Sequence, residues 1–128
     1  MDKKIIATGA VLGFTAIILE ASGAHALKKV LDASQLAAFE TGARYQMYHA
    51  LFLLFIGTAA YISDKAKKAI WYLCSFGVLF FSGSIYLLAT ESVSNIDFRA
   101  IGFITPIGGV LLIAAWGLLF LNILKKKA

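Results

Sequence analysis

Cysteine, charged residues and catalytic sequence motifs are scarce in this chain of 128 residues. Cys74 is its one cysteine, which excludes an internal disulfide and the paired cysteines of a zinc motif. Charged residues make up 15% of the chain and lie mainly between long apolar blocks. The chain has neither a glycine-rich phosphate loop nor a G-x-S-x-G motif. It therefore lacks the local signatures of nucleotide-binding enzymes and of serine hydrolases.

Apolar residues, in contrast, are in large excess. Hydrophobic residues make up 60% of the chain and the mean hydropathy is +0.82, whereas an average soluble domain is about 45–50% apolar. A soluble core of this length is too small to bury such an excess. The apolar blocks reach the ~20 residues that a transmembrane helix needs, about twice the length of a transmembrane β-strand. We therefore expect an all-α integral membrane protein with a single transmembrane domain over residues 1–128.

The sequence predicts four transmembrane spans, approximately at residues 5–24, 45–62, 69–89 and 101–124. Four spans place both termini on one side of the membrane. Eight basic residues share that side, namely Lys3, Lys4, Lys65, Lys67, Lys68, Lys125, Lys126 and Lys127. The opposite side holds only Lys28, Lys29, Arg44 and Arg99. Because basic residues mark the cytoplasmic side, both termini are predicted to lie inside, in a bacterial inner membrane.

The net charge of +5 comes from lysines that flank apolar blocks, and no basic face is interleaved with aromatic residues. This pattern reflects membrane topology, so we expect no binding to nucleic acid.

The segment between the first two spans is mixed in polarity. Asp32 and Gln35 have the spacing of a capping box, which predicts a helix that begins near Ala33. Apolar residues then recur at helical spacing. We expect a short amphipathic helix over residues 33–43 at the membrane surface, with Gly42 as the hinge into the second span. The expected fold is a four-helix bundle in the membrane with this interfacial helix between spans one and two.

The unusual polar residues gather at the outer side of the predicted bundle. This set comprises Glu20, His25, Tyr45, Gln46, His49, Ser82, Ser84, Tyr86, Thr105 and Pro106. Such a cluster could form a ligand site, a surface that docks a partner, or a polar packing layer.

Glu20 lies near the end of the first span. An ionised carboxylate inside a membrane is costly, so it should face protein or water. Gly9, Gly13 and Glu20 share one helix face, and G-x-x-x-G spacing allows close helix approach. The structural interpretation is that Glu20 hydrogen-bonds in the bundle or reaches the interface. The functional one is an acid that carries protons or binds a cation.

His25 and His49 could each bind a metal or a haem. Together with Glu20 they would supply two imidazoles and a carboxylate, a set able to bind zinc or iron. Their spacing matches no local metal motif, and hydrogen bonding within the packed bundle is the simpler interpretation. A third interpretation is that the two histidines contact a quinone or another lipid-like ligand. The cofactor, if any, stays unknown at this point.

Small residues and hydroxyls in the later spans indicate close helix packing. Gly83 lies between Ser82 and Ser84, and such residues inside a span usually serve packing and local hydrogen bonds. Proline is tolerated in the first turn of a helix, where Thr105-Pro106 falls. Gly108 and Gly109 follow, so this helix start can approach a neighbour closely.

Four segments in the same order resemble the "domain of unknown function 423" family of small bacterial membrane proteins. They are GAHAL at 23–27, YQMYH at 45–49, FSGSIY at 81–86 and TPIGG at 105–109, followed by Trp116. The resemblance covers nearly the whole chain and implies an inner-membrane protein with four spans. It implies no activity. Glu20 stands where members often have a small residue. The residues that match the family pattern fit a shared role better, namely His25, Tyr45, Gln46, His49, Ser82, Tyr86, Thr105 and Pro106.

The first functional hypothesis is a non-catalytic membrane protein, either an accessory subunit or a binder of a lipid-like ligand. Its expected partners are membrane lipids and either a second copy or a larger membrane complex. The second hypothesis is a small transporter or channel, which would need oligomerisation because four spans enclose little room. The third is a membrane redox protein with a metal or haem, which requires His25 and His49 to converge.

Overall fold

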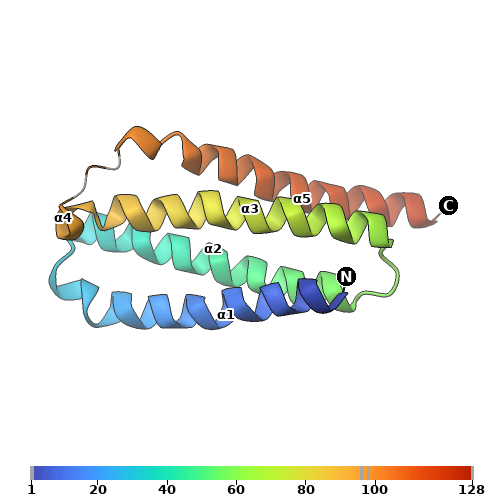
Figure 1. Cartoon of the computed structure of the whole chain (residues 1–128), viewed down its shortest axis with the longest axis horizontal. Coiled ribbons are helices and arrows are strands. Elements are labelled where there is room, and N and C mark those ends of the chain that lie inside the picture. The colour runs from blue at the N-terminus through green and yellow to red at the C-terminus, as the bar shows by residue number, and fades with distance from the viewer. Residues whose placement is uncertain (1, 96, 98, 128) are drawn as a thin grey trace.

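The computed structural model describes residues 2–95, 97 and 99–127. Its long helices are α1 (Asp2–Ala24), α2 (Ala33–Thr58), α3 (Asp64–Ala89) and α5 (Ile104–Lys127). The connections contain η1 (Leu27–Lys29), α4 (Glu91–Ser94) and η2 (Arg99–Ile101). The described residues form no strand. The long helices run antiparallel in chain order, and both termini lie at the same end of the bundle (Figure 1).

Within the described residues, three segments are long and apolar enough to cross a membrane. They are Asp2–Lys29, Asp64–Ala89 and Ile104–Lys125, which correspond to α1 with η1, to α3 and to α5. Large apolar side chains point outward from them, including Ile17, Leu79 and Ile113, which are 58% exposed or more. An apolar exterior of this extent is typical of a protein surrounded by lipid.

The segment expected as a separate interfacial helix is continuous with the second predicted span. Asp32 caps α2 with the predicted capping box: its Oδ1 accepts from the Gln35 backbone N–H at 2.8 Å, and Gln35 Oε1 accepts from the Asp32 N–H at 3.1 Å. From there α2 runs without a break to Thr58. The expectation of a hinge at Gly42 is therefore wrong. A helical glycine keeps its hydrogen bonds, and here it serves close packing against α3.

Each long helix packs on its neighbour in the sequence: α1 on α2, α2 on α3, and α3 on α5. Helices α2 and α5 are not an extensively packed pair among the described residues. Most of the buried apolar core lies between α2, α3 and α5 toward the end that carries the termini. It includes Leu53, Ile56, Ile70 and Cys74, all of which are fully buried.

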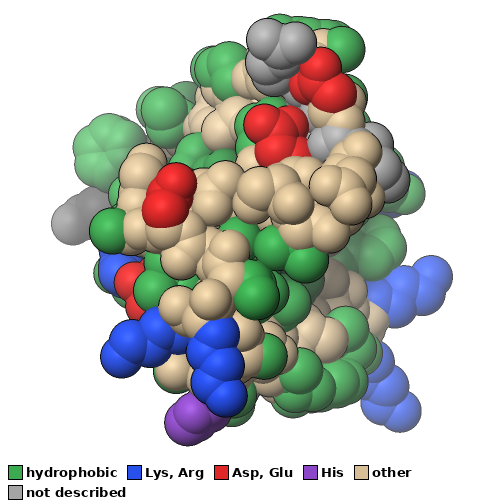
Figure 2. All heavy atoms as spheres, turned by 90° about the vertical axis from the view of Figure 1, so that its left-hand side faces the viewer, with side chains coloured by type: hydrophobic (Ala, Val, Ile, Leu, Met, Phe, Trp, Pro, Cys, Tyr) green, Lys and Arg blue, Asp and Glu red, His purple; other side chains and the backbone are tan. Residues whose placement is uncertain are grey.

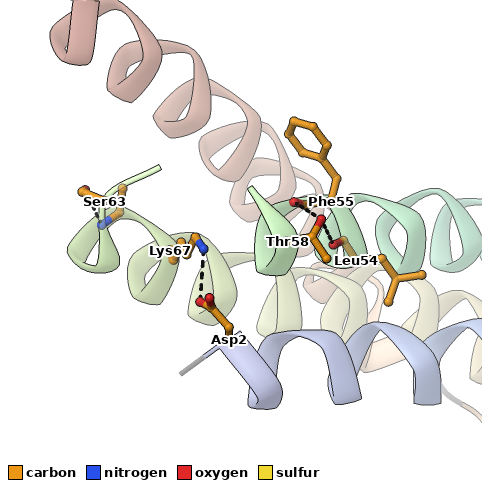
Figure 3. Close-up of polar contacts among 7 residues, drawn as sticks. Asp2, Leu54, Phe55, Thr58, Ser63 and Lys67 are labelled. Carbon is orange, nitrogen blue, oxygen red and sulfur yellow. Dashed lines mark hydrogen bonds and ion pairs between the residues drawn. The ribbon is translucent and has the colours of Figure 1, made fainter. Parts of the chain in front are cut away.

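One ion pair joins the starts of α1 and α3 at this end. Lys67 Nζ lies 3.1 Å from Asp2 Oδ1 (Figure 3). The side chain of Lys67 is 4% exposed, whereas that of Asp2 is 53% exposed. The buried ammonium group of Lys67 therefore has a partner of opposite charge in Asp2, whose carboxylate lies at the surface.

Candidate functional site

Gln46 links three helices in the half of the bundle far from the termini. Its Nε2 donates to the Leu12 carbonyl oxygen at 2.9 Å and to Thr15 Oγ1 at 2.7 Å, both on α1. Its Oε1 accepts from the Tyr86 hydroxyl of α3 at 2.7 Å. A buried amide without partners would be costly in apolar surroundings. Gln46 has partners on both sides, so it ties α2 to α1 and α3.

Close contact between α2 and α3 surrounds this link. Ser82 Oγ is buried and donates to the Gly42 carbonyl oxygen at 2.7 Å. A Cβ at Gly42 would lie 2.8 Å from the Tyr86 ring, so only glycine allows the approach. The Tyr86 ring also packs on Phe39, with centroids 5.1 Å apart. Tyr86 is thus placed by packing and by its hydrogen bond to Gln46.

His49 faces a different side of α2. Its Nδ1 lies 2.7 Å from the Tyr45 carbonyl oxygen. Because a carbonyl only accepts, Nδ1 carries the proton. Nε2 then accepts from the Trp116 indole N–H at 3.0 Å. Both ring nitrogens of this neutral imidazole are occupied, which leaves no lone pair for a metal unless Trp116 moves.

A third polar contact joins α3 to the start of α5. The hydroxyls of Ser84 and Thr105 hydrogen-bond to each other, and Ser84 also donates to the Phe81 carbonyl oxygen at 3.1 Å. Pro106 follows in the first turn of α5 and is exposed. The contact between Ser84 and Thr105 therefore joins α3 to α5.

Glu20 and His25 differ from Gln46, His49 and Ser82 of the polar set in their exposure. Both are exposed, and they lie at the end of α1 that Figure 2 faces, where charged side chains of both signs gather. His49 is buried within the bundle. Among the described residues, no three His, Cys, Asp or Glu side chains are grouped to hold a metal ion. The structure therefore does not bring Glu20, His25 and His49 together.

The glycines expected to serve packing fall into two classes. A Cβ at Gly9 would lie 2.8 Å from the Ala50 carbonyl oxygen, and one at Gly108 would collide with the backbone of Phe81. At Gly13, Gly83 and Gly109 the nearest atom is at an ordinary contact distance of 3.7 Å or more. The tight positions that sequence reasoning missed are Gly42, Gly57 and Gly77. A glycine in an apolar helix does not by itself reveal which of its neighbours approaches.

One largely apolar recess is a groove between α2 and α5. It has a volume of about 360 Å³ and opens sideways from the bundle. Tyr45 and His49 form one wall, Phe81 the floor, and Trp116 part of the other wall, which Gly109, Leu112 and Ile113 complete. The Trp116 ring is backed by Phe52, with centroids 4.1 Å apart. From the sequence, Trp116 is part of the family pattern and is expected in the half of the bundle that carries the termini, apart from the polar set that includes Tyr45 and His49.

The structure thus divides the predicted polar cluster into separate sets. Gln46, Ser82 and Tyr86 belong to the α1–α2–α3 contact, Tyr45 and His49 to the α2–α5 groove. Thr15 and Trp116 supply hydrogen-bond partners to Gln46 and His49. The sequence pattern did not indicate these two contacts.

Comparison with known proteins agrees with the sequence resemblance. Residues 19–109 match the family described as "Protein of unknown function (DUF423)". A UPF0382 membrane protein of Staphylococcus saprophyticus is 41% identical over 96% of this chain and 98% of its own length. One from Haemophilus influenzae is 36% identical over 100% and 99%.

The UPF0382 inner membrane protein YgdD of Escherichia coli is 33% identical over 98% of this chain and 93% of its own length. No solved structure matches the chain. The family match covers well over half of the chain, and these relatives align over nearly all of it. The chain therefore belongs to the DUF423 family, a family of membrane proteins of unknown function.

Proposed function

We propose that this chain is a non-catalytic inner-membrane protein with four spans that holds the hydrocarbon chain of a lipid in the groove between α2 and α5. The groove itself is the observation that carries the proposal. Its wall is apolar and aromatic, and the bundle leaves it open toward the surrounding bilayer.

The hydrogen bonding inside the groove favours an apolar occupant. His49 and Trp116 use their ring nitrogens on each other and on the Tyr45 carbonyl, so these two rings offer no free ring nitrogen to a ligand. A lipid chain that covers such a wall gains contact area and loses no hydrogen bond.

The ion pair between Asp2 and Lys67 supports a fourth span. It holds the starts of α1 and α3 at one end of the bundle. If both of these apolar helices cross the membrane, the chain must return between them, and α2 is the helix available. At about 1.5 Å per residue, its 26 residues are long enough. Its buried polar side chains, Gln46 and His49, bond inside the bundle, which lowers their cost in the membrane.

Labelling of introduced cysteines tests this topology. In a Cys74→Ala background, Lys28→Cys is expected to react with a membrane-impermeant maleimide in intact cells. Lys65→Cys is expected to react only after the membrane is opened, because basic residues favour the cytoplasmic side. Both positions are exposed. If α2 did not cross, the two cysteines would label from the same side.

Filling the groove should displace its occupant. Gly109→Leu places a side chain in the groove, and the nearest atom to a Cβ at this position is 3.7 Å away. We expect photo-crosslinking to a phospholipid with a diazirine on its acyl chain to fall about tenfold at Tyr45 and Trp116, which corresponds to about 1.4 kcal/mol.

Gly117→Leu is the matched control on the same helix. A Cβ there has no atom within 4 Å. Its crosslinking at Tyr45 and Trp116 should equal that of the original protein. An equal fall in both variants, or none in Gly109→Leu, would contradict the groove as a lipid site.

A further inference from the structure

A second recess lies at the end of the bundle that carries the termini, between the start of α3 and the end of α5. Its volume is about 250 Å³. Its lining combines the polar residues Ser63, Lys65, Asn122 and Lys125 with small or apolar ones, including Ala69 and Leu118. This composition differs from the apolar groove between α2 and α5.

Two lysines from different helices line this recess. Lys65 comes from the first turn of α3 and Lys125 from the last turns of α5. In the part of the chain that the structure describes, neither forms an ion pair. Lys67 does not contribute, because it reaches away to Asp2 (Figure 3). The recess therefore carries positive charge that the described protein does not neutralise.

An unpaired polar atom lies in the wall of the recess. Asn122 Nδ2 donates to Ser63 Oγ at 3.3 Å, while Asn122 Oδ1 is buried and has no hydrogen-bond partner among the described residues. Turning the amide over would pair Oδ1 with the Ser63 hydroxyl and leave Nδ2 without a partner. Either way, one amide atom remains for a ligand. Buried polar atoms are rarely left unpaired.

The N-terminus of α3 adds a favourable field. Ser63 caps this 26-residue helix by accepting from the Ala66 backbone N–H at 3.2 Å. The positive end of the helix dipole thus lies at the same recess as the two lysines. A negative group is favoured here, and a hydroxyl beside it would satisfy Asn122.

We propose that this recess binds the headgroup of an anionic phospholipid that carries both a phosphodiester and a free hydroxyl, as phosphatidylglycerol does. Lys65 and Lys125 hold the phosphate, Asn122 bonds the hydroxyl, and Ala69 and Leu118 contact the start of the acyl chains. At about 30 Å³ for a water-sized group, the recess has room for roughly eight such groups, enough for the phosphate group and part of the glycerol. The proposal depends on the topology proposed above only in assigning the site to the cytoplasmic leaflet.

This site is separate from the groove between α2 and α5. Asn122 and Trp116 are six residues apart on α5, which corresponds to about 240° around a helix. They therefore lie on different faces of α5, and a failure of one site leaves the other unaffected. Assays of headgroup binding and of chain crosslinking at the groove report on them independently.

Native mass spectrometry of the full chain in mild detergent tests the proposal. Phosphatidylglycerol should bind more tightly than phosphatidylcholine of the same chains. Lys65→Gln/Lys125→Gln should weaken phosphatidylglycerol binding about 30-fold, because each lysine near the membrane surface contributes about 1 kcal/mol. The control Lys28→Gln/Lys29→Gln makes the same charge change at the other end and should leave binding unchanged. Equal losses in both double variants would overturn the proposal.

Asn122→Leu tests the hydroxyl. It should remove the preference for phosphatidylglycerol over phosphatidic acid, which lacks the glycerol hydroxyl, while a thermal melt confirms that the variant folds. A preference that survives in this variant would contradict the role of Asn122. Inorganic phosphate and glycerol phosphate serve as soluble probes. If either competes with the lipid at equal concentration, the site is one for free phosphate and the lipid assignment is wrong.

Discussion

Gly108→Ala is expected to destabilise the protein by about 3 kcal/mol, the upper part of the range for overpacking a tightly packed interior. A Cβ at this position would collide with the Phe81 backbone and lie 2.8 Å from the Phe80 carbonyl carbon. Backbone atoms in the middle of α3 cannot rotate away as the end of a side chain can. The two helices must therefore separate, which also weakens the hydrogen bond between Ser84 and Thr105.

The neighbouring residue provides the control. At Gly109, a Cβ would meet only the Phe81 ring at 3.7 Å, an ordinary contact. Gly109→Ala should therefore change the free energy of unfolding by less than about 0.5 kcal/mol. Thermal unfolding of both variants in the same detergent measures the difference. Equal destabilisation of the two would contradict the close contact between α3 and α5 at Gly108 as the cause, because alanine has the higher helix propensity at both positions.

Asp2→Ala is expected to destabilise the protein by about 2 kcal/mol. The change leaves the Lys67 ammonium group without its partner, and this side chain is only 4% exposed. A buried charge without a partner costs about 1–3 kcal/mol or more. The expected loss is moderate because Asp2 is half-exposed and water screens the pair from one side.

Substitution of the other partner, Lys67, should destabilise the protein less. Lys67→Met removes the buried charge and leaves Asp2 at the surface, so the loss should be below about 1 kcal/mol. The double variant should be as stable as Lys67→Met alone. If Asp2→Ala still cost about 2 kcal/mol in the Lys67→Met background, the effect would come from the start of α1 and not from the ion pair.

The helix starts show how much of the fold local sequence determines. Asp32 and Gln35 satisfy N–H groups at the beginning of α2 by themselves, so their spacing predicts that start correctly. The continuity of α2 through Gly42 was not predictable in this way. Gly42 could have allowed either a bend in the helix or close contact with a neighbouring helix. The outcome depends on Tyr86, which packs against it and lies 44 residues further along the chain.

The candidate polar site shows the opposite limit. A sequence reveals that Gln46 and His49 are unusual in an apolar helix, and it places both in one half of the bundle. It does not reveal their directions. Gln46 and His49 are three residues apart, which corresponds to about 300° around a helix. Gln46 therefore bonds to α1 and α3, whereas His49 bonds to Trp116 of α5. The structure therefore contains separate cross-links where the sequence indicated one cluster.

The sequence by itself determined that the protein is all-α and belongs to a membrane, because long apolar blocks cannot be hidden in a soluble core of this size. It also determined the family, through segments that match in order. The tertiary structure decided which side chains meet. It paired His49 with Trp116, left Glu20 and His25 exposed, and opened two recesses along α5. The physical reason is that composition and hydropathy are properties of each segment alone, whereas contacts depend on how the helices are rotated against each other.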